Sequence, residues 1–239
     1  MLTDTLQQHG ISIGRDKLFD LLAEYGLLIR RRKRRKAVTT DSNHPFYKFP
    51  NLVRELQVLR PNHLWVSDIT YISLRDRFCY LSLVTDAYSR KIMGYSFRQD
   101  LAAEGCIEAL KMALNNKLYN QSIIHHSDRG SQYCSHNYVD LLLNNNIAIS
   151  MTENGDPYEN ALAERVNGII KTEFNLYSSS LGFEQTGYQI SKSIMSYNEL
   201  RPHASCDYLT PNQTHLQSEI LNKRWKNYHK SFNHEKTVV

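Results

Sequence analysis

Cysteine is scarce in this sequence, which has four among 239 residues and no pair at C-x-x-C spacing. The wide separation of Cys79, Cys106, Cys134 and Cys206 argues against a zinc knuckle or a disulfide framework, and it is typical of reduced thiols in cytoplasm. No apolar run approaches the roughly 18–20 residues that cross a bilayer. The opening MLTDTLQQHG lacks the apolar core of an export signal. We therefore expect a cytoplasmic protein without a membrane partner.

Basic charge is concentrated near the N-terminus. Residues 1–60 carry 12 Lys and Arg against 6 Asp and Glu, whereas the remaining residues carry 17 against 18. The excess comes from one uninterrupted run: Arg30, Arg31, Arg32, Lys33, Arg34, Arg35 and Lys36. Such a run must face water or a polyanion. Two interpretations stay open, a solvated tail or localisation signal and an arm that binds phosphates.

Residues 1–28 have the pattern of two short helices. The first is expected over 2–9 and stops at Gly10. The second is expected to be capped by Ser12, to carry an apolar stripe and to end at Gly26. Helix, turn and amphipathic helix describe a partial helix-turn-helix, although many packed helix pairs bind no DNA. The basic run that follows favours the DNA-binding interpretation.

A change of character near residue 61 marks the main domain. Before it, 29–60 is expected to be a basic linker with one helical patch near 52–59. After it, three β-rich runs are followed by helical and strand-like stretches in alternation. This order predicts an α/β fold with a ribonuclease H-like core, a mixed sheet with flanking helices, over 61–217. Residues 218–239 are expected to be a basic C-terminal tail.

Three carboxylates in this domain stand out. Asp68 lies inside a strand, where aspartate is rare and a buried carboxylate needs a partner or a metal; a structural salt bridge is the alternative. Asp128 ends a strand and is by itself more typical of a turn than of a catalytic site. Glu164 shares one side of the expected helix 161–174 with Asn167, Gly168 and Lys171. The alternative interpretation of this side is an ordinary polar helix face in contact with water.

Together the three carboxylates make an all-oxygen site suited to Mg²⁺, with Mn²⁺ as a substitute. Two such ions can flank a scissile phosphate. Lys171 and Asn167 would then face the neighbouring DNA phosphates. His125 and His126 lack His or Cys partners at ligand spacing, so we do not expect a histidine metal site.

The sequence also resembles a known family. Asp68, Asp128 and Glu164 have the D,D-35-E spacing of transposases and retroviral integrases. The words WVSDITYI, VTDAYSRKIMGY, HSDRGSQYCS, NGDPYENALAERVNGIIKTE and YNELRPHASCDYLTPNQTH resemble successive blocks of the "insertion sequence three" family of bacterial transposases. This resemblance implies Mg²⁺ held by the triad, DNA cleavage at the element's end, and joining of the freed 3′-OH to target DNA.

The resemblance also implies partners. These are double-stranded DNA with terminal inverted repeats, target DNA, further copies of the chain assembled on DNA, and an upstream helix-turn-helix segment fused by frameshifting. The expected location is the bacterial nucleoid. Tyr197, Asn198, Arg201, Pro202 and His203 are expected to be structural or to face DNA, and Asp86 to support the strand core. Cys206 replaces the family's usual leucine.

Two other functions compete with this interpretation. A non-catalytic DNA-binding regulator or degenerate remnant would keep the basic run without needing the triad. A ribonuclease H-like nuclease would share the fold and the metals, but the helix-turn-helix, basic linker and YNELRPH block favour a transposase.

We predict that replacing all seven residues of Arg30–Lys36 by glutamine weakens binding to every duplex similarly. Each phosphate contact that the change removes should lower the slope of log K against log [salt] by about 0.9. Titrations of random-sequence duplex over a range of salt concentrations measure this slope. An unchanged slope would make the run a solvated linker.

Overall fold

The computed structural model describes residues 2–28, 44–75, 77–117, 121–153, 160–176, 181–217 and 220–221. The basic run Arg30–Lys36 lies outside these residues, as does most of the expected tail 218–239. Within the described residues, no helix is both long and apolar enough to traverse a lipid bilayer.

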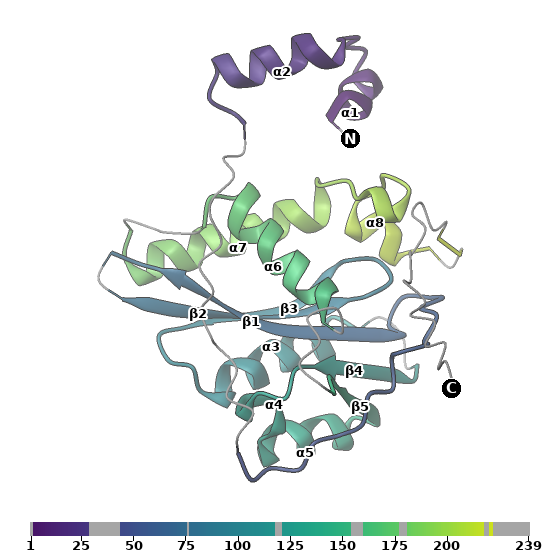
Figure 1. The fold of residues 1–239 in the computed structure, drawn as a ribbon, viewed down its shortest axis with the longest axis vertical. Coiled ribbons are helices and arrows are strands. Elements are labelled where there is room, and N and C mark those ends of the chain that lie inside the picture. The colour runs from purple at the N-terminus through teal and green to yellow at the C-terminus, as the bar shows by residue number, and fades with distance from the viewer. Residues whose placement is uncertain are drawn as a thin grey trace, which may run out of the picture.

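One five-stranded mixed sheet forms the centre of the molecule (Figure 1). Its strands are β1 (Leu64–Ser73), β2 (Phe78–Asp86), β3 (Ile92–Arg98), β4 (Ile123–Ser127) and β5 (Ile147–Met151). Their spatial order is β3-β2-β1-β4-β5. Strands β1 to β3 form an antiparallel meander, whereas β4 pairs with β1 and β5 with β4 in parallel. The predicted mixed α/β sheet is confirmed.

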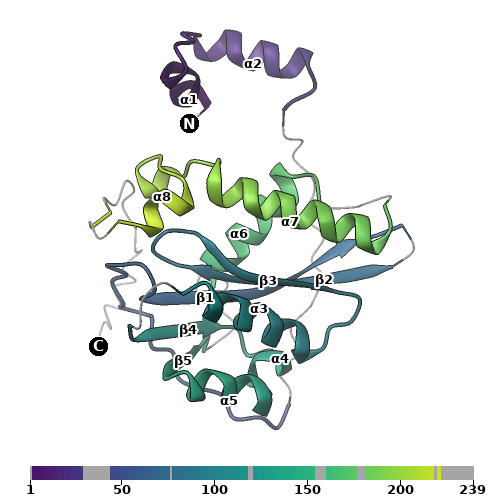
Figure 2. The same cartoon turned by 180° about the vertical axis from the view of Figure 1, so that it is seen from behind.

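Helices cover both faces of this sheet (Figures 1 and 2). On one face lie α3 (Ala103–Asn115), α4 (Ser131–Cys134) and α5 (His136–Asn144). On the other lie α6 (Ala161–Glu173) and α7 (Phe183–Glu199). The short η1 (Ala204–Cys206) and α8 (Pro211–His215) follow, and α1 (Leu2–Gln8) and α2 (Arg15–Glu24) precede the sheet. Each face of the sheet therefore has its own apolar core.

Alternation along β1 decides which side chains meet which helices. Trp65 belongs to the cluster under α3 and α5. Val66 packs in a cluster with residues of α6, and Ile72 packs with residues of α6 and α7. Because successive strand residues point to opposite faces, Asp68 and Thr70 share the α6 side with Val66 and Ile72.

The segment before β1 is not helical, so the expected helical patch over 52–59 is wrong. The Leu52 amide donates to Ser150 Oγ (2.9 Å), and the Met151 amide donates to Pro50 O (3.3 Å). Three apolar residues of the segment pack against the cluster of Leu64 and Val66: Val53, Leu56 and Val58. Contacts with the sheet edge thus replace the local hydrogen bonds that a helix would need.

Both N-terminal helices are confirmed, with one correction. Helix α2 has Gly14 at its N-cap rather than Ser12, and no side chain caps it. Leu18 is its buried residue, whereas Phe19 and Tyr25 are exposed. The apolar stripe located the helix correctly, but the backbone stays non-helical through Ser12, so the helix begins only at Arg15.

Asp86 is a buried structural anchor, in agreement with expectation. Its carboxylate accepts hydrogen bonds from the Asn62 amide (2.7 Å), the Ser89 amide (2.8 Å) and Ser89 Oγ (2.7 Å). Ser89 Oγ also lies 2.9 Å from Nδ1 of His215 in α8. The end of β2 is thereby tied to both the entry of β1 and helix α8.

We predict that Gly94→Ala lowers the free energy of unfolding by at least about 2 kcal/mol. A Cβ at Gly94 would lie 2.6 Å from Ala113 N and closer still to Ala109 O, both backbone atoms of α3. Gly168→Ala in α6 is the matched control, because its Cβ would meet nothing within 4 Å. That change should stabilise by roughly 0.5–1 kcal/mol. Urea unfolding of the two variants beside the parent chain tests the contrast.

Candidate active site

Asp68 occupies the middle of β1 and is half-buried beneath α6. Asn167 Nδ2 of α6 donates a hydrogen bond of 2.7 Å to Asp68 Oδ2. Since Asn167 is itself buried, its amide is held in place by packing. The aspartate's orientation is therefore set by the helix as well as by the strand.

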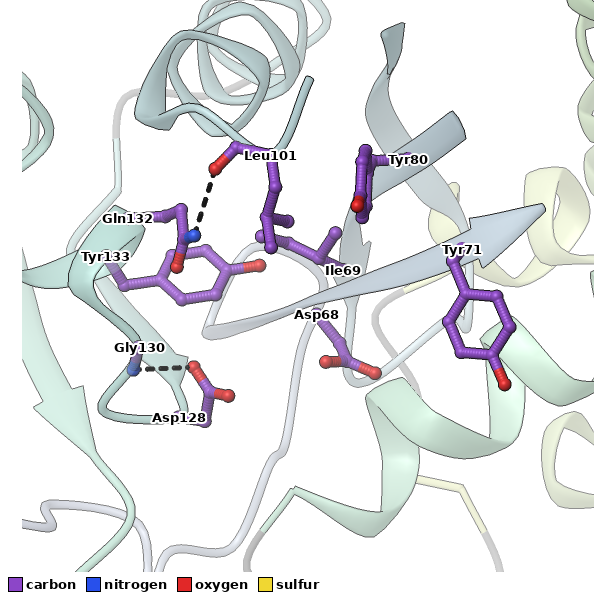
Figure 3. A pocket seen from close by; sticks show the side chains of 9 residues that line it. All are labelled: Asp68, Ile69, Tyr71, Tyr80, Leu101, Asp128, Gly130, Gln132 and Tyr133. Atoms are coloured by element: carbon purple, nitrogen blue, oxygen red, sulfur yellow. Dashed lines mark hydrogen bonds between the residues drawn. The ribbon is translucent and has the colours of Figure 1, made fainter. Parts of the chain in front are cut away.

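Asp128 lies one residue beyond β4, beside Asp68. The parallel register pairs Leu64 with Ile124 and Val66 with His126, and the same offset brings Asp128 level with Asp68. The Gly130 amide donates to Asp128 Oδ1 (3.0 Å), which fixes the turn. Figure 3 shows the two carboxylates lining one pocket, whose other lining residues are Ile69, Tyr71, Tyr80, Leu101, Gly130, Gln132 and Tyr133.

Electrostatics make the ionised form of Asp68 costly. Burial, followed by the negative charge of Asp128, raises the pKa of Asp68 to about 7, with a smaller upward contribution from Glu164. The hydrogen bond from Asn167 acts in the opposite direction. Neighbouring carboxylates that disfavour each other's charge are stabilised by a cation, and their all-oxygen donor set fits a hard divalent ion. The two aspartates thus offer oxygen ligands of the kind that a divalent metal ion binds.

Glu164 stands in the first turn of α6 and is exposed. It does not line the pocket of Asp68 and Asp128. Within the described part of the chain, no three His, Cys, Asp or Glu side chains are grouped closely enough to hold a metal ion. The structure therefore brings two of the predicted carboxylates together, and the third acts on Asp68 through its charge.

Lys171 and Asn167 both turn toward β1. Lys171 Nζ donates to Thr70 Oγ1 (3.1 Å) and lies 4.3 Å from the ring centroid of Tyr71. Burial lowers the pKa of Lys171, and the charge of Asp68 raises it. The sequence predicted that this side of α6 faces outward toward a ligand. In the structure, the Asn167 amide and the Lys171 ammonium instead contact residues of β1.

Several polar residues around the pocket were not predicted from the sequence. Gln132 and Tyr133 belong to the short helix α4 that follows Asp128, and Gln132 Nε2 donates to Leu101 O (3.0 Å). Asn160 Nδ2 donates to Ser67 O (3.0 Å), next to Asp68. Their residue types and spacings carry no chemical signal of their own, because the contacts join segments that are distant in the chain.

The adjacent histidines have hydrogen-bonding roles. His125 Nε2 lies 2.8 Å from Ser67 Oγ and 2.9 Å from Tyr138 Oη, and His126 Nδ1 lies 2.8 Å from Ser150 Oγ. Burial lowers the pKa of His125 to about 3. The neutral imidazole of His125 can therefore hydrogen-bond the hydroxyls of Ser67 and Tyr138 without adding a charge near Asp68.

The late sequence block makes structural contacts. Arg201 forms two bonds to Glu173 of α6, of 2.5 Å from Nε and 2.6 Å from Nη2. Asn198 of α7 bonds both the amide (2.9 Å) and the carbonyl (3.0 Å) of Ile92. Cys206 is fully buried. These contacts hold α6 and α7 on the sheet.

Comparison with known proteins identifies the family. The integrase core domain family matches residues 58–157 and 145–211. An insertion element IS600 protein of Shigella sonnei is 32% identical over 217 residues, which cover 88% of this chain and 78% of the relative. Transposase InsF for insertion sequence IS3A of Escherichia coli K12 is 30% identical over 214 residues, which cover 89% and 74%. The chain belongs to the IS3 family of insertion-sequence transposases.

Solved structures show the fold of this transposase. The catalytic core domain of HTLV-2 integrase, solved in complex with magnesium, aligns with a TM-score of 0.54 at 23% identity, covering 66% of this chain and 99% of that one. A simian T-cell lymphotropic virus intasome chain aligns with a TM-score of 0.59 at 20% identity, covering 90% and 70%. The predicted ribonuclease H-like core is confirmed.

Proposed function

We propose that this transposase cuts insertion-sequence ends and joins them to target DNA, with Asp68, Asp128 and Glu164 holding divalent metal. The observation that carries the proposal is the shared pocket of Asp68 and Asp128, in which burial and neighbouring charge raise the pKa of Asp68 to about 7. A bound cation stabilises the charged form of such a pair of carboxylates. Glu164 acts on the same aspartate from the first turn of α6.

Mg²⁺ suits these oxygen donors, and we propose that two ions bind. Mn²⁺ is expected to replace Mg²⁺. When bound, such ions stabilise charge on phosphate oxygens and activate an attacking hydroxyl. The chain's own contribution is orientation. Asn167 fixes the Asp68 carboxylate through its 2.7 Å hydrogen bond, and the Gly130 amide fixes Asp128.

Lys171 is proposed to contact DNA phosphates beside the pocket. Its ammonium lies over Tyr71, which lines the pocket, so the charge is close to any strand that enters there. Asn167 and the run Arg30–Lys36 remain proposed DNA contacts. We further propose that the chain binds double-stranded DNA and assembles on it as a homo-oligomer. An upstream fused segment and a location at the nucleoid are also part of the proposal.

We predict that Asp68→Asn, Asp128→Asn and Glu164→Gln each reduce Mg²⁺-dependent nicking and strand transfer at least about 100-fold, because each removes one metal-binding charge. The substrate is duplex carrying the element's terminal repeats. Glu184→Gln, an exposed residue in the first turn of α7, is the matched control and should cut normally.

Duplex binding should survive in the three variants, which separates a defect in chemistry from a defect in folding. Activity within about tenfold of the parent in one variant would remove that residue from the site. Robust cleavage in EDTA would exclude the whole mechanism.

We predict a smaller effect for Lys171→Ala, about tenfold in cleavage, with partial recovery in Lys171→Arg. Removing one phosphate contact misplaces the DNA but leaves the carboxylates intact. Lys192→Ala is the control, because Lys192 Nζ likewise lies over a tyrosine ring, Tyr188 of α7, at 5.5 Å. Equal activity of the Lys171 and Lys192 variants would show that Lys171 only packs on β1.

A further inference from the structure

A second cluster of charged side chains lies where the β2–β3 turn, α6 and the segment after α7 meet. Arg201 Nη1 donates to His203 Nε2 (3.0 Å), and Tyr197 Oη donates to the carbonyl of Arg90 (3.0 Å). Arg90 Nε donates to Ser205 Oγ (3.2 Å). The charge of Arg165 in α6 acts on both Arg90 and His203. Three guanidinium groups therefore converge on one region.

Only one of the three guanidinium groups has a carboxylate partner among the described residues. Arg201 is paired with Glu173. Arg90 donates to Ser205 Oγ and to the carbonyl of Ala87, which are neutral acceptors. Arg165 is exposed and forms no hydrogen bond or ion pair with the described part of the chain. Arg90 and Arg165 thus have no carboxylate bonded to them among the described residues.

The nearby acidic groups offset only part of this charge. Asp86 acts on Arg90 through its charge, and its oxygens accept hydrogen bonds from Asn62 and Ser89 rather than from a guanidinium group. Burial lowers the pKa of Arg90; among the neighbouring charged groups, Asp86 raises this pKa and Arg165 lowers it. A half-buried cation beside a like charge is costly unless an anion joins it.

Phosphate is the anion that matches this chemistry. Guanidinium groups bind phosphate oxygens through paired hydrogen bonds. Arg165 directly follows Glu164, and Ala163 of α6 packs in one cluster with Ala87 of the β2–β3 turn. The cluster therefore adjoins the proposed catalytic side of α6 without lining the pocket of Asp68 and Asp128.

We propose that Arg90 and Arg165, supported by Arg201, form a binding site for a backbone phosphate of DNA that crosses the N-terminal end of α6. This inference rests on the proposed action on DNA. The site positions the strand and is separate from the carboxylate pocket.

The test is binding of a random-sequence duplex to the full chain in EDTA, across a range of salt concentrations. Arg165→Gln should weaken binding roughly threefold and lower the log–log salt slope by about 0.9. Arg165→Lys keeps the charge and should keep the slope. Lys111→Gln, an exposed residue of α3 on the opposite face of the sheet, is the matched control and should change neither quantity.

Arg90→Gln combined with Arg165→Gln should lower the slope by about 1.8, provided that the urea unfolding midpoint shows a folded chain. An unchanged slope in folded Arg165→Gln would overturn the proposed phosphate site. Because binding in EDTA requires no chemistry, that result would leave the cleavage mechanism standing. Conversely, a lowered slope together with normal cleavage in Asp68→Asn would retain the phosphate site and reject the catalytic proposal.

Discussion

The parallel pairing of β1 with β4 is the constraint on which the site depends. Its register places Asp68 level with Asp128, although 59 residues separate them in the chain. A slip of one residue would move Asp68 to the opposite face of the sheet, against α3 instead of α6. The repulsion between the two carboxylates therefore exists only because the rest of the sheet fixes this register.

Buried polar contacts hold β1 to its neighbouring strands on both sides. Trp65 Nε1 donates to Asn62 Oδ1 (3.1 Å), and the Asn62 amide donates to Asp86. On the other side, His125 of β4 joins Ser67 of β1 by a bond of 2.8 Å. These directional contacts distinguish one register from another more sharply than apolar packing does.

Local patterns made much of this structure predictable. A β-rich run located β1, and the aspartate within that strand lines the pocket that the structure shows. The helix periodicity that placed Glu164 could not show that Asn167 turns inward to bond Asp68, because that contact depends on where α6 crosses the sheet. The same limit applies to Arg201 and Glu173, whose pairing joins residues 28 apart. Segment 52–59 escaped prediction because many of its contacts are made with residues of the sheet that are distant in the chain.

Helix α6 carries residues of both the proposed catalytic site and the proposed phosphate site. Residues three, four and seven apart share a face, so Glu164, Asn167 and Lys171 all act toward β1. Arg165 is rotated by about 100° from Glu164, and its charge acts on Arg90 of the β2–β3 turn instead. Because Val166 and Ile170 pack the helix onto the sheet, any shift of α6 moves both faces together. The carboxylates and the proposed phosphate site are consequently held at a fixed spacing, as strand positioning during cleavage requires.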